Sequence, residues 1–458
     1  MKILLICPSS EIPFRYDGDY PLGLLYLASI LEKKGHDVIV KNSYPRPWKD
    51  CREGFIKDIK DLSPDVVGLS CVTRNRISCF DLINQTKRIN PNIKIIMGGV
   101  HASSLYEQIL RKFPLDAIVL GEGETTTPEL MDAFLRRKSL SKVKGIAYKN
   151  KKGEIKITPP RMPIHNLDEI PFPKHELFEE VMKKSKIALM MTSRGCPYGC
   201  TFCSTSVYWG RRWRPRSAKN VVDEIEHILK KFPYVKEILF YDDTMIVDNQ
   251  RVIDICEEII RRGIKIKWNC SARIDRVSKE MLIKMKQAGC KRITYGIESG
   301  SPKILKSIEK KITREHILKA VQITNEVGLE YGAYLMVGNP GEDWETIKET
   351  RKFLRRLKNL VVESIGRLEI YPNTAIYELS KKQGTIEDSY WLENKVVPHY
   401  TYEHSADELT KMAYYLIATN QLQKGLFNFI LFGLKFFLNK PEKAIRFVLL
   451  RLHLIKET

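Results

Sequence analysis

Three cysteines stand close together in the segment SRGCPYGCTFCSTS. Cys196, Cys200 and Cys203 are separated by three and then two residues. Cysteine thiolates hold iron–sulfur clusters, and a four-iron cube usually takes four of them. A structural zinc site would need a fourth Cys or His nearby, but the next cysteine is Cys256, and His227 falls in a predicted helix. The spacing therefore predicts a cluster with one iron left open for an outside ligand.

The elements around the cysteines predict a βα barrel. Strand-like runs alternate with amphipathic helical patterns such as 218–232 and 249–263. Six strands with intervening helices indicate a complete or partial barrel over 186–404, with its site on the loops after the strands. The six runs are IALMMTS after position 186, EILFYDD (237–243), KIKWNCS (265–271), RITYGIES (292–299), EYGAYLMVG (330–338) and GRLEIYP (366–372).

The first 140 residues predict a separate α/β domain. Runs of Val, Ile and Leu at 2–7, 65–71, 93–99 and 116–124 alternate with helical patterns such as 22–34. This alternation is typical of a doubly wound, Rossmann-like parallel sheet, where ligands bind beyond the carboxyl ends of the strands. No G-x-G-x-x-G follows the first strand, which counts against a dinucleotide.

Two further segments flank the barrel. Residues 141–185 carry five prolines and short strand-like pieces, and we interpret them as a linker. Residues 405–458 read as a helical C-terminal region, in which GLFNFILFGLKFFL (425–438) is apolar almost all round. Its wide apolar face with lysines suits an amphipathic helix at a membrane interface, and a buried helix that closes the barrel mouth is the alternative.

The composition limits the location and the partners. Lys and Arg number 76 against 55 Asp and Glu, a net charge of +21. This surplus suits nucleic acid, an anionic membrane or an acidic ligand, and does not choose between them. No run of some 18 apolar residues predicts a spanning helix, and the apolar run before Pro8 is too short for a signal peptide. We expect a cytoplasmic protein with reduced cysteines.

With Phe202 in the aromatic place of C-x3-C-aromatic-C, residues 190 to 375 resemble the radical S-adenosylmethionine superfamily. The resemblance implies that S-adenosylmethionine chelates the open iron and is cleaved by one electron to methionine and a 5′-deoxyadenosyl radical. It also implies a carboxylate for the methionyl amine, an arginine for its carboxylate, a glutamate for the ribose and a glycine-containing loop against the adenine. The implied cofactor-binding residues are Phe202, Asp242, Asp243, Arg273, Glu298, Ser299, Gly338, Pro340, Gly341 and Tyr371.

The front domain is similar to the cobalamin-binding subgroup of that superfamily, on the pieces PLGLLYLASILEKKGHDV, PDVVGLS, IIMGGVHAS and DAIVLGEGE. Domains that bind cobalt through histidine use D-x-H-x-x-G, and none of the nine histidines has Asp two residues before it. The resemblance therefore implies cobalamin without a histidine ligand. The implied residues are Pro21, Leu22, Gly23, Ser70, Val72, Thr73, Gly98, Gly99, His101, Gly121 and Glu122, although His101 alone reads as an ordinary polar loop residue.

The family resemblance implies a cobalamin-dependent methyltransferase that acts on an unactivated carbon of a hydrophobic small molecule or lipid. Ring closure, carbon–carbon coupling and RNA modification are alternatives within the family. The run VYWGRRWRPRS could stack and contact nucleic acid, but no RNA-binding module accompanies it, so we favour a role beside the site. A cobalamin sensor or membrane-associated adaptor would leave the cysteine triplet unexplained.

Two partners complete the expectations. The family chemistry needs a reductant such as ferredoxin or flavodoxin, because the cluster must be reduced before it can cleave S-adenosylmethionine. The basic and apolar segment 425–455 predicts peripheral membrane contact.

Overall fold

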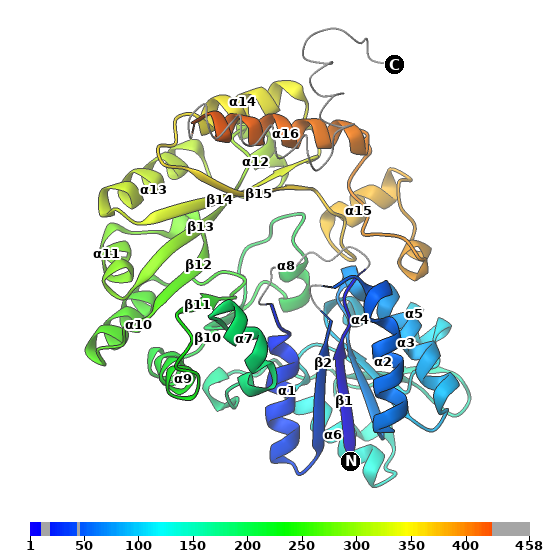
Figure 1. The fold of residues 1–458 in the computed structure, drawn as a ribbon. Coiled ribbons are helices and arrows are strands. Elements are labelled where there is room, and N and C mark those ends of the chain that lie inside the picture. Colours follow the sequence, from blue (N-terminus) through cyan, green and yellow to red (C-terminus); the bar gives the residue numbers. More distant parts are fainter. Residues whose placement is uncertain (11–18, 44–45, 424–458) are drawn as a thin grey trace.

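The computed structural model describes residues 1–10, 19–43 and 46–423, which form two α/β units side by side (Figure 1). The first unit holds a seven-stranded sheet, and the second holds a six-stranded sheet that curves around one side of the molecule. The α/β class expected from the sequence is therefore confirmed.

The first sheet has the order β2-β1-β3-β4-β5-β6-β7. Its first five strands pair in parallel, and the strand order reverses between β1 and β3, which is the place where doubly wound sheets bind ligands. The strands are β1 (Lys2–Cys7), β2 (Asp37–Asn42), β3 (Val66–Ser70), β4 (Lys94–Gly98), β5 (Ala117–Val119), β6 (Ile146–Lys149) and β7 (Ile155–Ile157).

The segment 141–185 does more than connect the two units. Its strands β6 and β7 pair antiparallel with β5 and with each other, and so extend the first sheet. Beyond β7 the chain crosses to the second unit through α7 (Glu179–Ser185).

Helices cover both faces of the first sheet, as its nearly continuous apolar strands require. Helix α1 packs against α6 on one face, and α2 packs against α3 on the other. The helices are α1 (Leu22–Lys33), α2 (Trp48–Leu62), α3 (Arg76–Ile89), α4 (Val100–Ser104), α5 (Tyr106–Lys112) and α6 (Gly123–Leu135).

The second sheet is a partial βα barrel. Its six strands are all parallel and lie in chain order, β8-β11-β12-β13-β14-β15, with helices along the outer side (Figure 1). The strands are β8 (Ile187–Met190), β11 (Glu237–Phe240), β12 (Lys267–Arg273), β13 (Cys290–Glu298), β14 (Glu330–Val337) and β15 (Val361–Arg367), and the outer helices are α9 (Ala218–Lys231), α10 (Asn249–Arg261), α11 (Lys279–Gln287), α12 (Pro302–Ser307), α13 (Arg314–Val327) and α14 (Trp344–Leu354).

The last barrel strand differs from the prediction. The sequence placed it at 366–372, but β15 ends at Arg367. Leu368 and Ile370 leave the barrel and are buried with residues of the first unit. These apolar side chains therefore serve a different core from the one that their pattern suggested.

The two units share their cores. One cluster of buried side chains runs from the α1 side of the first sheet into the barrel. A second cluster joins the α2 side to 368–400, which includes α15 (Ala375–Lys382). Apolar contact on both sides of the sheet fixes the first unit against the barrel.

Helix α16 (Ala406–Gln423) packs on α14 and β15, through Leu409, Met412 and Leu416. The amphipathic segment 425–455 lies outside the described residues. Within the part of the chain that the structure describes, no helix combines the length and the apolar character needed to cross a bilayer.

Candidate active site

The three cysteines lie on one loop directly after β8 and the short strand β9 (Ser193–Gly195). Strand β9 pairs antiparallel with β10 (Trp213–Pro215), which folds the loop and the helix α8 (Ser204–Trp209) back over the barrel edge. Gly195 is required at the start of the loop, because its φ is +87° and an added Cβ would lie 2.1 Å from the carbonyl oxygen of Arg212. The backbone therefore sets the direction in which the cysteines project.

The cysteine side chains are partly exposed and influence one another. Burial raises the pKa of Cys196 to about 11, and the charges of Cys203 and Cys200 add to that rise. Among the described residues, no three His, Cys, Asp or Glu side chains are arranged around a single ion. A cubane takes each thiolate at a different iron, so its ligands stand farther apart than those of a one-metal site. The loop has the donors and the exposure for a cluster.

The two aspartates after β11 hold the flanks of the cysteine loop. Asp242 is buried and accepts hydrogen bonds from the Thr192 amide at 3.0 Å, the Thr192 hydroxyl at 2.9 Å and the Ser193 hydroxyl. Asp243 accepts from the Gly195 amide at 3.1 Å, and burial raises its pKa. Asp242 is thus occupied within the protein, and Asp243 is the carboxylate nearer to the cysteines.

Two basic side chains lie beside Cys200. Arg273 lies 3.8 Å over the Tyr198 ring, with Nη1 3.9 Å from the Cys200 sulfur. Its Nη2 donates to the Lys310 carbonyl at 2.7 Å. Burial raises the pKa of Cys200, and the charges of Lys310 and Arg273 oppose that rise. Arg273 is itself paired with Asp275 at 3.0 Å and Lys310 with Glu298 at 2.9 Å, so both cations near Cys200 already have a carboxylate partner.

Lys310 is a site residue that the sequence did not reveal. The side chain is buried, and its Nζ donates to Glu298 Oε1 at 2.9 Å. Its neighbours Glu309 and Lys311 both have positive φ, 50° and 56°, and Glu298 has φ 64°. Strained backbone of this kind persists where the surrounding structure imposes it, often at functional sites. In the sequence, Lys310 is one of two adjacent lysines with no motif around it.

The remaining predicted residues for S-adenosylmethionine have other contacts. Ser299 is buried against the Thr350 hydroxyl at 3.0 Å. Tyr371 donates to Glu369, which forms an ion pair with Arg74 of the first unit. The loop after β14 contains Gly338, Pro340 and Gly341, with φ of 85° and 76° at the two glycines.

A carboxylate closes this glycine loop from inside. Glu342 is buried and accepts from the Gly338 amide at 2.6 Å and the Asn339 amide at 3.1 Å. Burial raises its pKa to about 7. The loop is therefore held by its own glutamate.

A cavity of about 230 Å³ lies at the carboxyl ends of β1, β3, β4 and β5, where the first unit meets the cysteine loop. Arg194, Tyr208 and Trp209 close it from the barrel side. Added Cβ atoms at Gly23 and Gly121 would meet nothing within 4 Å. Bare backbone around free space is what an extended ligand needs for close approach. Six residues predicted for cobalamin line the cavity: Gly23, Ser70, Gly98, Gly99, Gly121 and Glu122.

The other five residues predicted for cobalamin lie outside the cavity wall: Pro21, Leu22, Val72, Thr73 and His101. His101 is buried, and its Nδ1 lies 3.2 Å from the Thr73 hydroxyl. Burial lowers the pKa of His101 to about 3, and the charge of Arg76 contributes. The side chain is a neutral core residue between Phe80 and Trp391.

Buried ion pairs connect the cavity to the cysteine loop. Glu122 pairs with Arg194 at 2.7 Å and with Arg214 at 2.9 Å, and Glu124 pairs with Arg194 at 2.6 Å. Burial alone would raise the pKa of Glu122, but the bonds from Arg214 and Arg194 outweigh it and lower the pKa. Tyr208 adds a bond from its hydroxyl to the Gly121 carbonyl at 2.8 Å. The sequence placed Glu122 in a ligand loop but did not pair it with these arginines.

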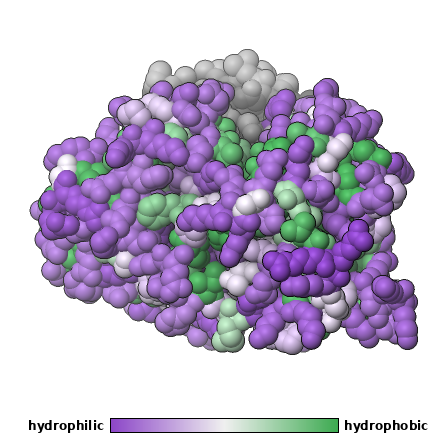
Figure 2. Space-filling model, turned by 90° about the horizontal axis from the view of Figure 1, so that it is seen from below, coloured by the Kyte–Doolittle hydropathy of each residue, from purple (hydrophilic) through white to green (hydrophobic). Residues whose placement is uncertain are grey.

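The concave side of the barrel exposes aromatic rings. Tyr331 lies on the helix-covered side of β14, so the alternation of strand side chains directs Tyr334 inward. Tyr334 is 36% exposed, and Tyr241, which follows β11, is 42% exposed. The face seen from below is mostly hydrophilic, with apolar patches in its central part (Figure 2).

Two family profiles match the chain. The Radical SAM superfamily profile matches residues 190–354, and the B12 binding domain profile matches residues 16–131. Together they cover the cysteine loop with the four barrel strands β11 to β14, and the strands β2 to β5 of the first sheet.

Known proteins resemble the chain over nearly its full length. A protein described as an uncharacterized methyltransferase of Pyrococcus horikoshii is 33% identical over 431 residues, 91% of this chain and 93% of the relative. The anaerobic magnesium-protoporphyrin IX monomethyl ester cyclase of Rubrivivax gelatinosus is 30% identical, over 78% of this chain and 66% of the relative. The solved structure of the cobalamin-dependent S-adenosylmethionine radical enzyme OxsB, with aqua-cobalamin and S-adenosylmethionine bound, has a TM-score of 0.72 at 21% identity and covers 99% of this chain and 75% of OxsB.

Proposed function

Because this chain belongs to the radical S-adenosylmethionine superfamily, in the group that carries a B12-binding domain, we propose that it methylates an unactivated carbon of a hydrophobic small molecule or lipid. The protein is an enzyme of the methyltransferase-like branch, and its cofactors are a [4Fe–4S] cluster, S-adenosylmethionine and cobalamin. The substrate class is the part that we propose.

One observation supports the proposal most directly. The helix that follows the third cysteine also supplies Tyr208 and Trp209 to the wall of the glycine-lined cavity. The cluster loop and the cavity of the B12-binding domain therefore share a boundary. An enzyme that generates a radical and delivers a methyl group to the same carbon needs its two cofactor sites to be neighbours.

When bound, the cluster supplies an electron for cleavage of S-adenosylmethionine, and the corrin carries the methyl group. The chain's own residues bind these cofactors and orient them. Cys196, Cys200 and Cys203 would hold the cluster. Arg273 and Lys310 lie beside Cys200, and each is held in place by a carboxylate partner, Asp275 and Glu298 respectively. In the loop after β14, the left-handed glycines let the backbone turn tightly, and Gly338 packs against Leu409 of α16.

The aromatic side chains on the concave face of the barrel support the proposal of a hydrophobic substrate. Tyr241 and Tyr334 expose aromatic rings there, and aromatic rings bind apolar surface while each hydroxyl remains able to make a polar contact. The cyclase relative is named for a large apolar macrocycle, which supports the same class.

The test uses the full chain, reconstituted anaerobically with iron, sulfide and hydroxocobalamin, and S-adenosylmethionine with a deuterated methyl group. We expect 5′-deoxyadenosine together with a lipid-soluble product from a membrane extract that carries the deuterated methyl group. Absence of 5′-deoxyadenosine would contradict the radical reaction, and label only in water-soluble products would contradict the substrate class.

Ring closure is the second candidate, because the cyclase relative is 30% identical to this chain. It predicts 5′-deoxyadenosine and a product that has lost hydrogen but gained no label. The same mass spectra separate the two reactions.

We also propose peripheral membrane contact through the basic and apolar segment 425–455. The sequence supports this proposal by its lysines and arginines beside apolar residues. Removal of residues 420–458 should abolish flotation with anionic liposomes, and unchanged flotation would contradict the contact.

A further inference from the structure

Two exposed arginines lie on the outer side of the cysteine loop. Arg211 and Arg212 follow helix α8, and both side chains are exposed. An added Cβ at Gly199 would lie 2.6 Å from the guanidinium carbon of Arg211, so this cation rests on the backbone between Cys196 and Cys200. The positive charge therefore lies directly outside the proposed cluster.

These two arginines differ from their neighbours. Arg194, Arg214 and Arg216 are each paired with a buried glutamate. Neither Arg211 nor Arg212 forms an ion pair with any side chain in the described ranges. Unpaired surface cations contribute little to stability, whereas they can steer a charged partner.

An apolar side chain accompanies the charges. Val207, on α8, is 38% exposed. Together Val207, Arg211 and Arg212 form a small patch, which we call the loop patch, with an apolar point beside two cations. The two cations, rather than the single apolar side chain, give the patch its character.

The proposed chemistry requires an electron from outside the chain. The other seven cysteines in the described ranges are all buried. Cys79 contacts Cys71 and Cys290 contacts Cys270, but none of the seven has the spacing of a cluster motif. The chain offers no second cluster there to relay the electron. The donor must then approach the cysteine loop from its exposed side, which is where the loop patch lies.

We infer that the loop patch is the docking surface for an acidic, flavin-carrying donor protein of the flavodoxin type. The inference rests on the proposed function, because only a redox-active cluster needs a donor. Carboxylates around the flavin would meet Arg211 and Arg212, and the apolar edge of the flavin ring would meet Val207. The anionic flavin hydroquinone gives up one electron to become the neutral semiquinone, and the cluster gains that electron; no proton moves and no bond breaks.

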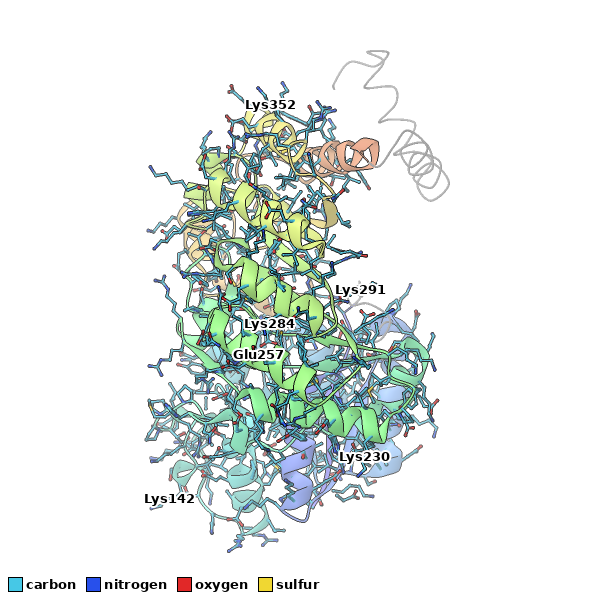
Figure 3. The ribbon with its side chains drawn as sticks, turned by 90° about the vertical axis from the view of Figure 1, so that its left-hand side faces the viewer. Lys142, Lys230, Glu257, Lys284, Lys291 and Lys352 are labelled. Atoms are coloured by element: carbon cyan, nitrogen blue, oxygen red, sulfur yellow. The ribbon has the colours of Figure 1, made fainter. Side chains whose placement is uncertain are left out.

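Charge elsewhere on the molecule supplies a matched control. Lys230 and Lys352 project from the outer helices of the barrel (Figure 3), and both are exposed. The variant Lys230→Glu/Lys352→Glu changes the net charge as much as Arg211→Glu/Arg212→Glu does. A general effect of net charge would slow both variants equally, and a docking effect would slow only the second.

The experiment measures anaerobic bleaching of the reconstituted cluster by stopped flow, with flavodoxin hydroquinone, reduced ferredoxin or photoreduced deazaflavin as the reductant. With flavodoxin at low salt, Arg211→Glu/Arg212→Glu should be reduced at least about tenfold more slowly than the parent. With deazaflavin, which is small and needs no docking, the two rates should agree within about twofold. The lysine control should match the parent throughout, and added salt should slow the parent but not the arginine variant.

Several results would overturn the inference: an unchanged rate with flavodoxin, an equal loss with deazaflavin, or a loss with ferredoxin alone. If the double variant holds less iron, Arg212→Glu alone decides the question, because only the Arg212 backbone touches the loop at Gly195. With flavodoxin, the cluster of this single variant should be reduced about threefold more slowly than that of the parent. Normal docking without 5′-deoxyadenosine or methylated product would refute the proposed function and leave the docking surface standing.

Discussion

The cysteine loop and the glycine-lined cavity share a boundary, yet they are built by opposite means. Around the cysteines, charged and polar side chains are numerous and nearly all have partners: Asp242 is occupied by Thr192 and Ser193, and Lys310 by Glu298. The cavity wall instead offers bare backbone at Gly23 and Gly121. The comparison teaches that the first region selects by charge and donor type, and the second by shape.

Loss of a cluster ligand should separate the two regions most sharply. Cys203→Ala should lose most of its iron and all cleavage of S-adenosylmethionine, because a cube held by two thiolates is poorly retained. Cobalamin uptake should stay within about twofold, since the cavity wall does not include the cysteine. Iron analysis and the optical spectrum of bound cobalamin measure both.

The control for this variant is Cys51→Ala in α2, a buried cysteine far from the triplet in sequence. It should retain the full iron content of the parent. Equal loss of cobalamin and iron in Cys203→Ala would show that the two regions form one cooperative site.

The next effect concerns the ion pairs that join the regions. Arg194→Leu leaves Glu124 without its cation and removes one partner of Glu122, both of them in a buried setting. Breaking a buried pair in this way costs about 3–5 kcal/mol, which urea unfolding would detect. Lys219→Leu, which removes an exposed pair with Asp223, should change the free energy of unfolding by less than about 1 kcal/mol. Equal effects would show that the network contributes little to holding the regions together.

Filling the cavity tests the region that selects by shape. Gly23 lies in the first turn of α1, and a side chain there would enter the free space. Gly23→Leu should weaken cobalamin binding by about 10- to 100-fold, the equivalent of 1–3 kcal/mol of overpacking. The cluster and the yield of 5′-deoxyadenosine should be unchanged, whereas methyl transfer should fall.

Gly54→Leu in α2 is the matched control, because it is also a helical glycine with nothing within 4 Å of an added Cβ. Both substitutions favour the helix by up to about 1 kcal/mol, so neither should unfold the chain. Cobalamin binding that survives in Gly23→Leu would mean that cobalamin does not occupy this cavity.

The contrast between the regions also explains what the sequence could predict. The cysteine triplet is a local pattern whose spacing carries its chemistry, and the alternation of apolar runs defined both sheets. Lys310 and Arg194 were missed because their partners, Glu298 and Glu122, are 12 and 72 positions away. The family resemblance assigned His101 and Thr73 to cobalamin, but both side chains are buried and contact each other.

A buried glutamate gives the prediction whose sign is clearest. Burial raises the pKa of Glu342 from 4.5 to about 7, so the folded state holds this proton more tightly than the unfolded chain. The contribution of Glu342 to the free energy of unfolding is therefore greatest below pH 4.5. It falls as the pH rises from there to about 7, and is level above. Each pKa unit corresponds to about 1.4 kcal/mol. Glu342→Gln should flatten this decline in the free energy of unfolding, followed by urea titration at a series of pH values.

His404 also has a raised pKa and must be separated from Glu342, although its effect on stability begins at a higher pH, near its ordinary value of 6.5. Burial alone would lower its pKa, but its bonds to the Glu342 carbonyl and to Glu408 raise it, so its stabilisation is also lost with rising pH. A residual slope in Glu342→Gln should disappear when His404→Gln is added. Glu122→Gln is the control of opposite sign: the lowered pKa of Glu122 makes the parent lose stability as the pH falls below the ordinary range of a carboxyl. The two substitutions should change the pH dependence of the free energy of unfolding in opposite directions. A change in the same direction would refute the opposite pKa shifts assigned to Glu342 and Glu122.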